Sequence, residues 1–124
     1  MRLLLRLPLA DAVEQHVFDP TARAVAPDLI NAEVLHAIRR FERRRELDAE
    51  RSAAAIDDLS DLPIARYPTL ALLERAWTLR QNFAAYDAMY VALAEALDVA
   101  LVTTDGHLAA AVRAMTGVGI VLVE

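Results

Sequence analysis

Two apolar runs separated by a helical segment, in the last third of the chain, restrict the fold more than any other feature of the sequence. The runs DVALVTT (98–104) and GIVLVE (119–124) flank DGHLAAAVRAM (105–115), and Gly117 and Gly119 mark the break after the helix. Both runs are continuously apolar rather than alternating, which is typical of parallel strands buried on both faces. Strands joined through one short helix form a right-handed βαβ unit. We therefore predict an α/β sandwich with a parallel sheet.

The rest of the chain also divides into short helices and strands. The expected helices before the last third are 9–18, 28–46 with Asp28 as its cap, 48–62 starting at Asp48, 69–83 capped by Thr69, and 86–97. The segment 22–27 is expected to be a strand that Pro27 ends, and 63–67 is a short apolar piece. The sequence contains no repeat and no Gly/Ser-rich linker, so we predict a single domain over residues 1–124.

Composition excludes several classes of protein. No run of 18 apolar residues occurs, and charges and Pro8 interrupt the apolar start, so we expect neither a membrane span nor a signal peptide, and a cytoplasmic protein. The chain has no cysteine, which excludes disulfides and thiolate metal sites. The net charge of −5 argues against nonspecific binding of nucleic acid, which depends on a cationic surface, but it leaves room for a local basic patch.

Three acidic residues stand at the ends of apolar elements. Asp87 lies in the first turn of an almost wholly apolar helix, Asp105 follows the strand VALVTT, and Glu33 borders an apolar helical stripe, about 40° from Ala37. Each has an ordinary structural explanation, because acids favour helix N-termini and Asp105 can cap the helix after it. Asp105 also lies where open α/β sheets bind their ligands, just past the carboxyl end of a strand. A cap and a ligand are not exclusive.

Other polar and aromatic residues point to structural roles. The three histidines lack the spacing of metal ligands, so surface or capping roles are expected for His16, His36 and His107. The arginine cluster at 39–45, interrupted by Glu42, is interpreted as a solvated helical face, with an RNA or partner contact as the alternative. Trp77 and Tyr86 are expected in the core or at its boundary.

The order of these motifs carries a resemblance. APDLINAEVLHAI, AAYDAMYVALAEAL, LVTTDGHL and an apolar strand after glycine follow one another over roughly residues 20 to 124. This arrangement resembles PIN-domain ribonucleases, and among them the VapC toxins of bacterial toxin–antitoxin pairs. The resemblance implies a three-layer sandwich with a central parallel sheet flanked by helices.

The resemblance also implies a site and an activity. Glu33, Asp87 and Asp105 would converge at the carboxyl edge of the sheet and hold Mg²⁺ or Mn²⁺, ions that suit hard oxygen ligands, and Thr103 would steady the site or a bound water. The expected activity is a metal-dependent endoribonuclease that cleaves single-stranded RNA to a 5′-phosphate and a 3′-hydroxyl. The expected partners are a second copy of the chain and a small VapB-like antitoxin that inserts an arginine toward the acids.

The start of the chain departs from the family pattern. Family members begin with a central strand that ends in an aspartate, whereas here the first acid is Asp11, in a segment that resembles the helix after that strand. The domain is therefore expected to lack the usual first strand. Either residues 1–7 fill the gap as a substitute strand, since unpaired central edges are avoided, or the true start lies upstream, which the sequence favours.

The missing acid leaves three functions open. Beside the endoribonuclease, the chain is interpreted as a catalytically impaired PIN-like module that binds an antitoxin or another protein, or as an acidic structural domain. Loss of one carboxylate weakens a metal site, because changes even in the second ligand shell typically cost about 10- to 100-fold in metal affinity or activity. The structural reading predicts no effect of divalent ions on the melting temperature.

Overall fold

A computed structural model describes residues 2–6 and 23–123 of the chain. The helix expected at 9–18, including Asp11, and His16 lie outside the described residues. The strands are β1 (Arg2–Arg6), β2 (Arg23–Pro27), β3 (Ile64–Tyr67), β4 (Ala100–Thr103) and β5 (Ile120–Leu122). The helices are α2 (Ile30–Arg43), α3 (Ala49–Asp61), the 3₁₀ turn η1 (Leu70–Leu72), α4 (Leu73–Thr78), α5 (Ala85–Leu97) and α6 (Gly106–Met115).

The strands form one five-stranded sheet in the order β3-β2-β1-β4-β5, and every neighbouring pair is parallel. The parallel α/β prediction is therefore confirmed. The central place belongs to β1, where Leu4 pairs with Val25 of β2 on one side and with Leu101 of β4 on the other. The alternative that the first residues fill the central gap as a substitute strand is borne out, because residues 2–6 pair with both neighbouring strands.

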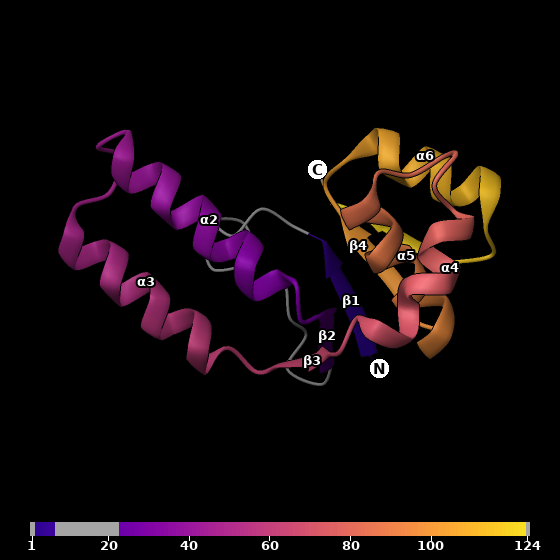
Figure 1. Ribbon diagram of the computed structural model, residues 1–124, viewed down its shortest axis with the longest axis horizontal. Coiled ribbons are helices and arrows are strands. Elements are labelled where there is room, and N and C mark those ends of the chain that lie inside the picture. The colour runs from indigo at the N-terminus through magenta and orange to yellow at the C-terminus, as the bar shows by residue number, and fades with distance from the viewer. Residues whose placement is uncertain (1, 7–22, 124) are drawn as a thin grey trace.

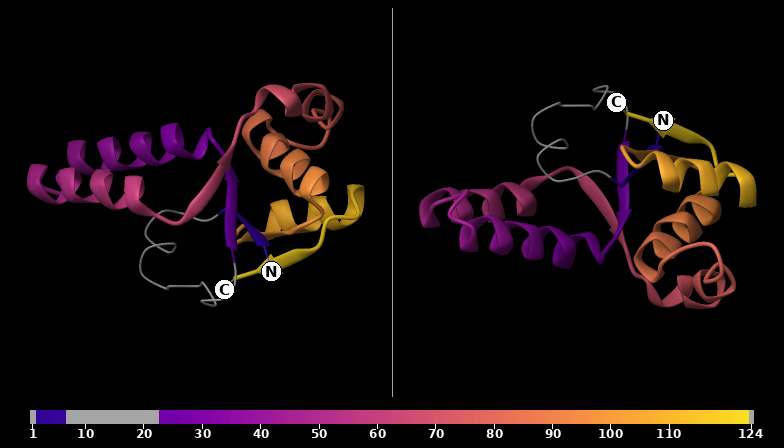
Figure 2. Two further views of the ribbon diagram at one scale, coloured as in Figure 1. Left: turned by 90° about the horizontal axis from the view of Figure 1, so that it is seen from below. Right: turned by 90° about the horizontal axis from the view of Figure 1, so that it is seen from above.

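Helices cover the two faces of this sheet. The pair α2 and α3 lies on one side, and α4, α5 and α6 lie on the other, as the edge-on views show (Figure 2). The strand order changes direction at β1, because β2 and β3 extend the sheet one way while β4 and β5 extend it the other way. In open α/β sheets, ligands bind outside the carboxyl ends of the strands at such a change of direction. The three-layer sandwich is therefore confirmed. Its topology indicates the carboxyl edge of the sheet, near β1, as the place for a ligand.

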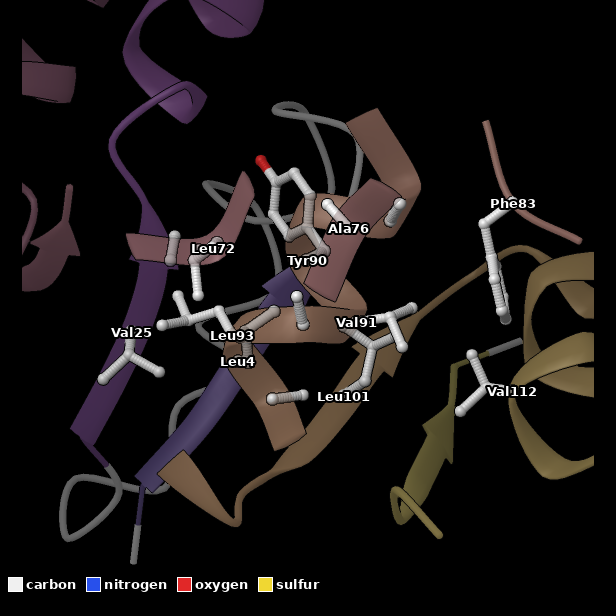
Figure 3. Close-up of a cluster of buried hydrophobic side chains, with 14 of the residues drawn as sticks. Leu4, Val25, Leu72, Ala76, Phe83, Tyr90, Val91, Leu93, Leu101 and Val112 are labelled. Atoms are coloured by element: carbon white, nitrogen blue, oxygen red, sulfur yellow. The ribbon is translucent and has the colours of Figure 1, made fainter. Parts of the chain in front are cut away.

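The main core lies between the sheet and α5. Leu4, Val25 and Leu101 from the three central strands meet Val91 and Leu93 of α5, all at most 3% exposed (Figure 3). The helix is apolar nearly all round and is buried from Ala88 to Ala94, except at Met89. Burial of one such side chain contributes roughly 1.5–3 kcal/mol. This packing fixes the start of α5 relative to the ends of the central strands.

The helices α2 and α3 form an antiparallel pair that extends away from the sheet (Figure 1). Its own small core contains Val34, Ile38 and Leu59. Arg66 of β3 ties the pair to the sheet: its Nε donates to Asn31 Oδ1 at 2.6 Å, and its Nη2 donates to the carbonyl of Leu59 at 2.7 Å. The α2–α3 pair is therefore held to the sheet at the end where α2 begins.

Helix starts agree with the sequence at some positions and not at others. The Asp48 side chain accepts from the Arg51 amide at 2.7 Å, which confirms this cap. The expected cap at Asp28 is wrong: α2 begins at Ile30 without a side-chain cap, and the Asp28 amide donates to the Tyr67 carbonyl at 2.8 Å, which continues the pairing of β2 with β3. Thr69 makes no capping hydrogen bond either, and the helix expected there is divided into η1 and α4.

The last strand differs from the expectation of burial on both faces. Val121 is 43% exposed and Leu122 is 39% exposed, because β5 is the edge strand of the described sheet, next to β4. Its apolar sequence alone does not distinguish a central from an edge strand.

None of the helices described in this structure combines the length and the apolar character needed to cross a membrane.

Candidate functional site

Glu33 lies in the first turn of α2, close to the carboxyl end of β2. Its Oε1 accepts a 2.6 Å hydrogen bond from the hydroxyl of Tyr90 on α5, whose ring is 1% exposed. Figure 3 shows the Tyr90 oxygen at the margin of the apolar cluster that surrounds the ring. A hydroxyl bonded to a carboxylate is a short, strong, charge-assisted hydrogen bond. Glu33 is therefore held by a helix from the opposite face of the sheet.

Asp87 lies in the first turn of α5, and the N-cap residue of this helix, Ala84, provides no side-chain cap. The helix precedes β4 and runs back along it, so its first turn lies at the carboxyl edge of the parallel sheet. Asp87 is half-buried and stands one turn before Tyr90, the residue that bonds Glu33. An acid at this place interacts favourably with the helix dipole. The first-turn position expected for Asp87 is confirmed.

Asp105 caps α6 at the end of β4. Its Oδ1 accepts from the amides of His107 at 2.9 Å and Leu108 at 3.2 Å, as the sequence predicts. The buried Thr103 hydroxyl oxygen accepts from the Asp105 amide at 3.0 Å, so it fixes the backbone that carries this carboxylate. The side chain of Asp105 is exposed, and within the described residues both of its capping hydrogen bonds go to Oδ1 and none to the second oxygen.

The three acids therefore start three helices at one edge of one sheet, although they do not close into an ion site. Among residues 2–6 and 23–123, no group of three or more His, Asp or Glu side chains is placed to hold a metal ion. The central strand β1 has the sequence RLLLR and supplies no acid within its bounds. The donor chemistry fits a hard divalent cation, since all three residues offer carboxylate oxygens. The types of side chain therefore suit such an ion, although the described side chains are not grouped around one position.

A hollow of about 420 Å³ adjoins Glu33, between α2 and the start of α5. Its apolar wall consists of Leu29, Ala32 and Ala37. Its polar rim consists of Glu33, His36, Arg40 and Tyr86. Volumes of roughly 300–1,000 Å³ are usual for small-ligand sites. The acidic edge therefore continues into a hollow that is lined by an arginine, a histidine and an aromatic ring.

Several sequence expectations are resolved around this edge. His36, His107 and the arginines of 39–45 are exposed, which confirms their solvated positions. Trp77 and Tyr86 are 67% and 65% exposed, so their expected place in the core or at its boundary is wrong. The role of Tyr90 escaped the sequence reasoning. Its signal was a tyrosine within an apolar helix, because a buried hydroxyl usually has a hydrogen-bond partner.

Comparison with known proteins agrees with this architecture. Residues 2–114 match the model of the PIN domain. Ribonuclease VapC1 of Mycobacterium tuberculosis is 52% identical over 87 residues, and VapC ribonuclease Mb0985 of Mycobacterium bovis is 45% identical over 83 residues. These alignments cover 69% and 67% of this chain, and 65% of the length of either relative. Ribonuclease VapC12 of Mycobacterium tuberculosis is 34% identical over 88% of this chain and 83% of its own length.

Two solved structures have the same fold. One is VapBC2 from Rickettsia felis bound to a DNA fragment from their promoter, with a TM-score of 0.67 and 13% identity over 98% of both chains. The other is PAE2754 from Pyrobaculum aerophilum, with a TM-score of 0.66 and 22% identity over 97% of this chain and 91% of that one. The sequence resemblance is confirmed: this chain belongs to the PIN-domain family and is similar within it to the VapC ribonucleases.

Proposed function

We propose that this protein is a metal-dependent endoribonuclease toxin that cleaves RNA phosphodiesters and is inhibited by a VapB-like antitoxin. One observation carries the proposal: Glu33, Asp87 and Asp105 each begin or follow the start of a different helix at the carboxyl edge of the same parallel sheet. The similarity to proteins named VapC ribonucleases supports it. The acids come from separate parts of the sequence, so their common position is a property of the fold.

In this proposal the three carboxylates hold Mg²⁺ or Mn²⁺, and Thr103 steadies the backbone of Asp105 through its 3.0 Å hydrogen bond. When bound by these carboxylates, such an ion would supply Lewis-acid chemistry: it would polarise the phosphodiester and lower the pKa of an attacking water. The described acids do not form a group of three, so the proposal requires the three carboxylates to approach one another when an ion binds. The Tyr90 hydroxyl limits how far Glu33 moves.

Cleavage of a labelled single-stranded RNA in Mg²⁺ or Mn²⁺ tests the proposal. We expect Asp87→Asn and Glu33→Gln to abolish cleavage and Asp98→Asn to leave it intact. Asp98 is a matched acid at the other end of α5, where it ends the helix with φ of 51°. A chain that cuts no RNA with either ion, or a chain whose activity survives Asp87→Asn, would contradict the proposal.

Metal binding has a readout that is independent of activity. An ion that binds the folded chain at 100 times its dissociation constant raises the free energy of unfolding by about 2.7 kcal/mol. We expect Mn²⁺ to raise the melting temperature of the parent chain and not that of the Asp87→Asn variant. No shift in either protein would favour the structural reading of the acids.

A second function is favoured by a different observation. The described part of the central strand carries no acid, and the described acids do not form a group of three, as expected for a catalytically impaired PIN-like module. Such a module binds an antitoxin or another protein without cutting RNA. Antitoxin binding that persists in a chain without nuclease activity would identify it.

The remaining expectations concern assembly and location. We propose that the protein forms a homodimer, that an arginine of the antitoxin enters the acidic edge, and that the protein acts in the cytoplasm as a single domain over 1–124. Light scattering of the chain alone measures whether it is a homodimer, and light scattering with an antitoxin measures the stoichiometry of the complex. Titration with an antitoxin whose arginine is changed to glutamine tests the contact.

A further inference from the structure

The hollow between α2 and the start of α5 is a candidate binding site that the acidic edge alone does not explain. Its rim carries Arg40, His36 and Tyr86, and Glu33 belongs to both the hollow and the acidic edge. We propose that this hollow, named here the α2–α5 hollow, binds one nucleotide of single-stranded RNA next to the bond that is cut. The inference rests on the proposed function and assigns the base to Tyr86 and a phosphate to Arg40.

The charges along α2 favour a nucleic-acid strand. At about 100° per residue, Arg40 lies within about 20° of Glu33 on the helix surface, seven positions further on, and Arg44 follows as the C-cap residue of α2. Both arginines are exposed, and within the described residues the Arg40 guanidinium has neither an ion pair nor a hydrogen bond. A stripe of cations thus leads away from the acidic edge in a chain whose net charge is −5. A phosphate backbone that runs along α2 would pair with this stripe while its scissile end meets the acids.

The exposed ring of Tyr86 favours a base as the occupant. Tyr86 is 65% exposed at the start of α5 and lines the hollow, and its ring contacts no cation or other ring within the described part of the chain. The other strongly exposed aromatic, Trp77, already has the Arg80 guanidinium over its ring, with Cζ 4.3 Å from the centroid. Bases stack on aromatic side chains in single-strand sites, independently of sequence. Tyr86 is therefore the ring that is open to a base beside the acids.

The test measures RNA binding without cleavage. The probe is a fluorescein-labelled single-stranded RNA of about 10 nucleotides, within the usual size of single-strand sites. Anisotropy is recorded in Mg²⁺ on the full chain with Asp105→Asn. Asp105 is the N-cap residue of α6 and does not line the hollow, and asparagine keeps an oxygen for the helix cap. Circular dichroism checks that each variant is folded.

Two substitutions separate the phosphate contact from the base contact. We expect Arg40→Gln to weaken binding and to reduce the slope of log affinity against log salt by about 0.7, the value for one phosphate contact on a single strand. The control Arg39→Gln removes an equal charge from the same helix, about 120° away from Glu33, and should leave the slope unchanged. We expect Tyr86→Leu to weaken binding about 5- to 150-fold at an unchanged slope, and Tyr86→Phe to bind like the parent.

Each outcome decides the inference separately from the proposed function. Equal effects of Arg40→Gln and Arg39→Gln, or normal binding by Tyr86→Leu, would overturn the inference even if the parent chain cuts RNA. Substitutions that weaken an antitoxin peptide but not the RNA probe would also overturn it, in favour of a protein occupant. If the variants have the expected effects on RNA binding but the parent chain does not cleave RNA, the nucleotide site is supported and the proposed nuclease activity is contradicted.

Discussion

The hydrogen bond between Tyr90 and Glu33 gives the sharpest test of how the acidic edge is held. Tyr90→Phe removes only the hydroxyl that donates to Glu33 Oε1 at 2.6 Å and keeps the ring that is 1% exposed in the core. A hydrogen bond to a charged group contributes about 1.5–3 kcal/mol, and we expect a loss near the middle of this range, about 2 kcal/mol. With an unfolding entropy of about 2.1 cal/mol/K per residue over 124 residues, the melting temperature should fall by about 8 °C.

Thermal unfolding followed by circular dichroism measures this loss, and the chain offers a matched control. Tyr86→Phe removes a hydroxyl from the same helix, but that residue is 65% exposed, so its change should stay within about 0.5 kcal/mol. A double-mutant cycle with Glu33→Ala isolates the pair, because residues in contact show a coupling energy of about 0.5–3 kcal/mol. Equal stability of the two phenylalanine variants, or additive effects in the cycle, would refute the argument.

Three further changes address other contacts of the fold. Asp105→Ala should lower the free energy of unfolding by about 1 kcal/mol through loss of the α6 cap, whereas Asp105→Asn should keep stability and lose RNA cleavage; urea titration and the cleavage assay separate the two roles. Arg66→Ala should cost about 1–3 kcal/mol, because it leaves the carbonyl of α3 without its donor, and hydrogen exchange should show α2 and α3 opening more readily. Arg75→Gln should lower the free energy of unfolding by less than about 1 kcal/mol, and by less in high salt. Its 2.9 Å ion pair with Glu95 is half-exposed and therefore screened by salt, although the hydrogen bond to Glu95 raises the pKa of Arg75.

Local sequence signals predicted those features that depend on neighbours in the chain. Asp48 and Asp105 each precede a helical run, and both side chains accept the amides of the first turn. Asp28 has the same signal and does not act as a cap, because its amide extends the pairing of β2 with β3. That pairing involves Tyr67, 39 positions further along the chain, and no local pattern contains it.

Features that depend on the topology were beyond the sequence reasoning. Tyr90 and Glu33 are separated by 57 positions, and only the burial of α5 against the central strands brings them together. The exposure of Tyr86 was missed because a large aromatic ring beside an apolar helix is usually buried. Its position at the mouth of the α2–α5 hollow follows from where α2 lies, on the other face of the sheet.

The acids at the edge of this apolar core follow from the way a parallel sheet is connected. Every helix after a strand starts at the carboxyl edge, and α5 starts there as well because it runs back along β4, so acids that favour helix N-termini gather at one place. The same residues can therefore stabilise the fold and bind a ligand. Loss of activity on removing Asp105 does not by itself show that Asp105 binds a metal ion. Glu33 and Tyr90 add a bond over this edge between helices on opposite faces. If Asp105→Asn keeps its stability and loses RNA cleavage, Asp105 acts on RNA. If the double-mutant cycle shows that Glu33 and Tyr90 contribute to stability as a coupled pair, their hydrogen bond stabilises the edge.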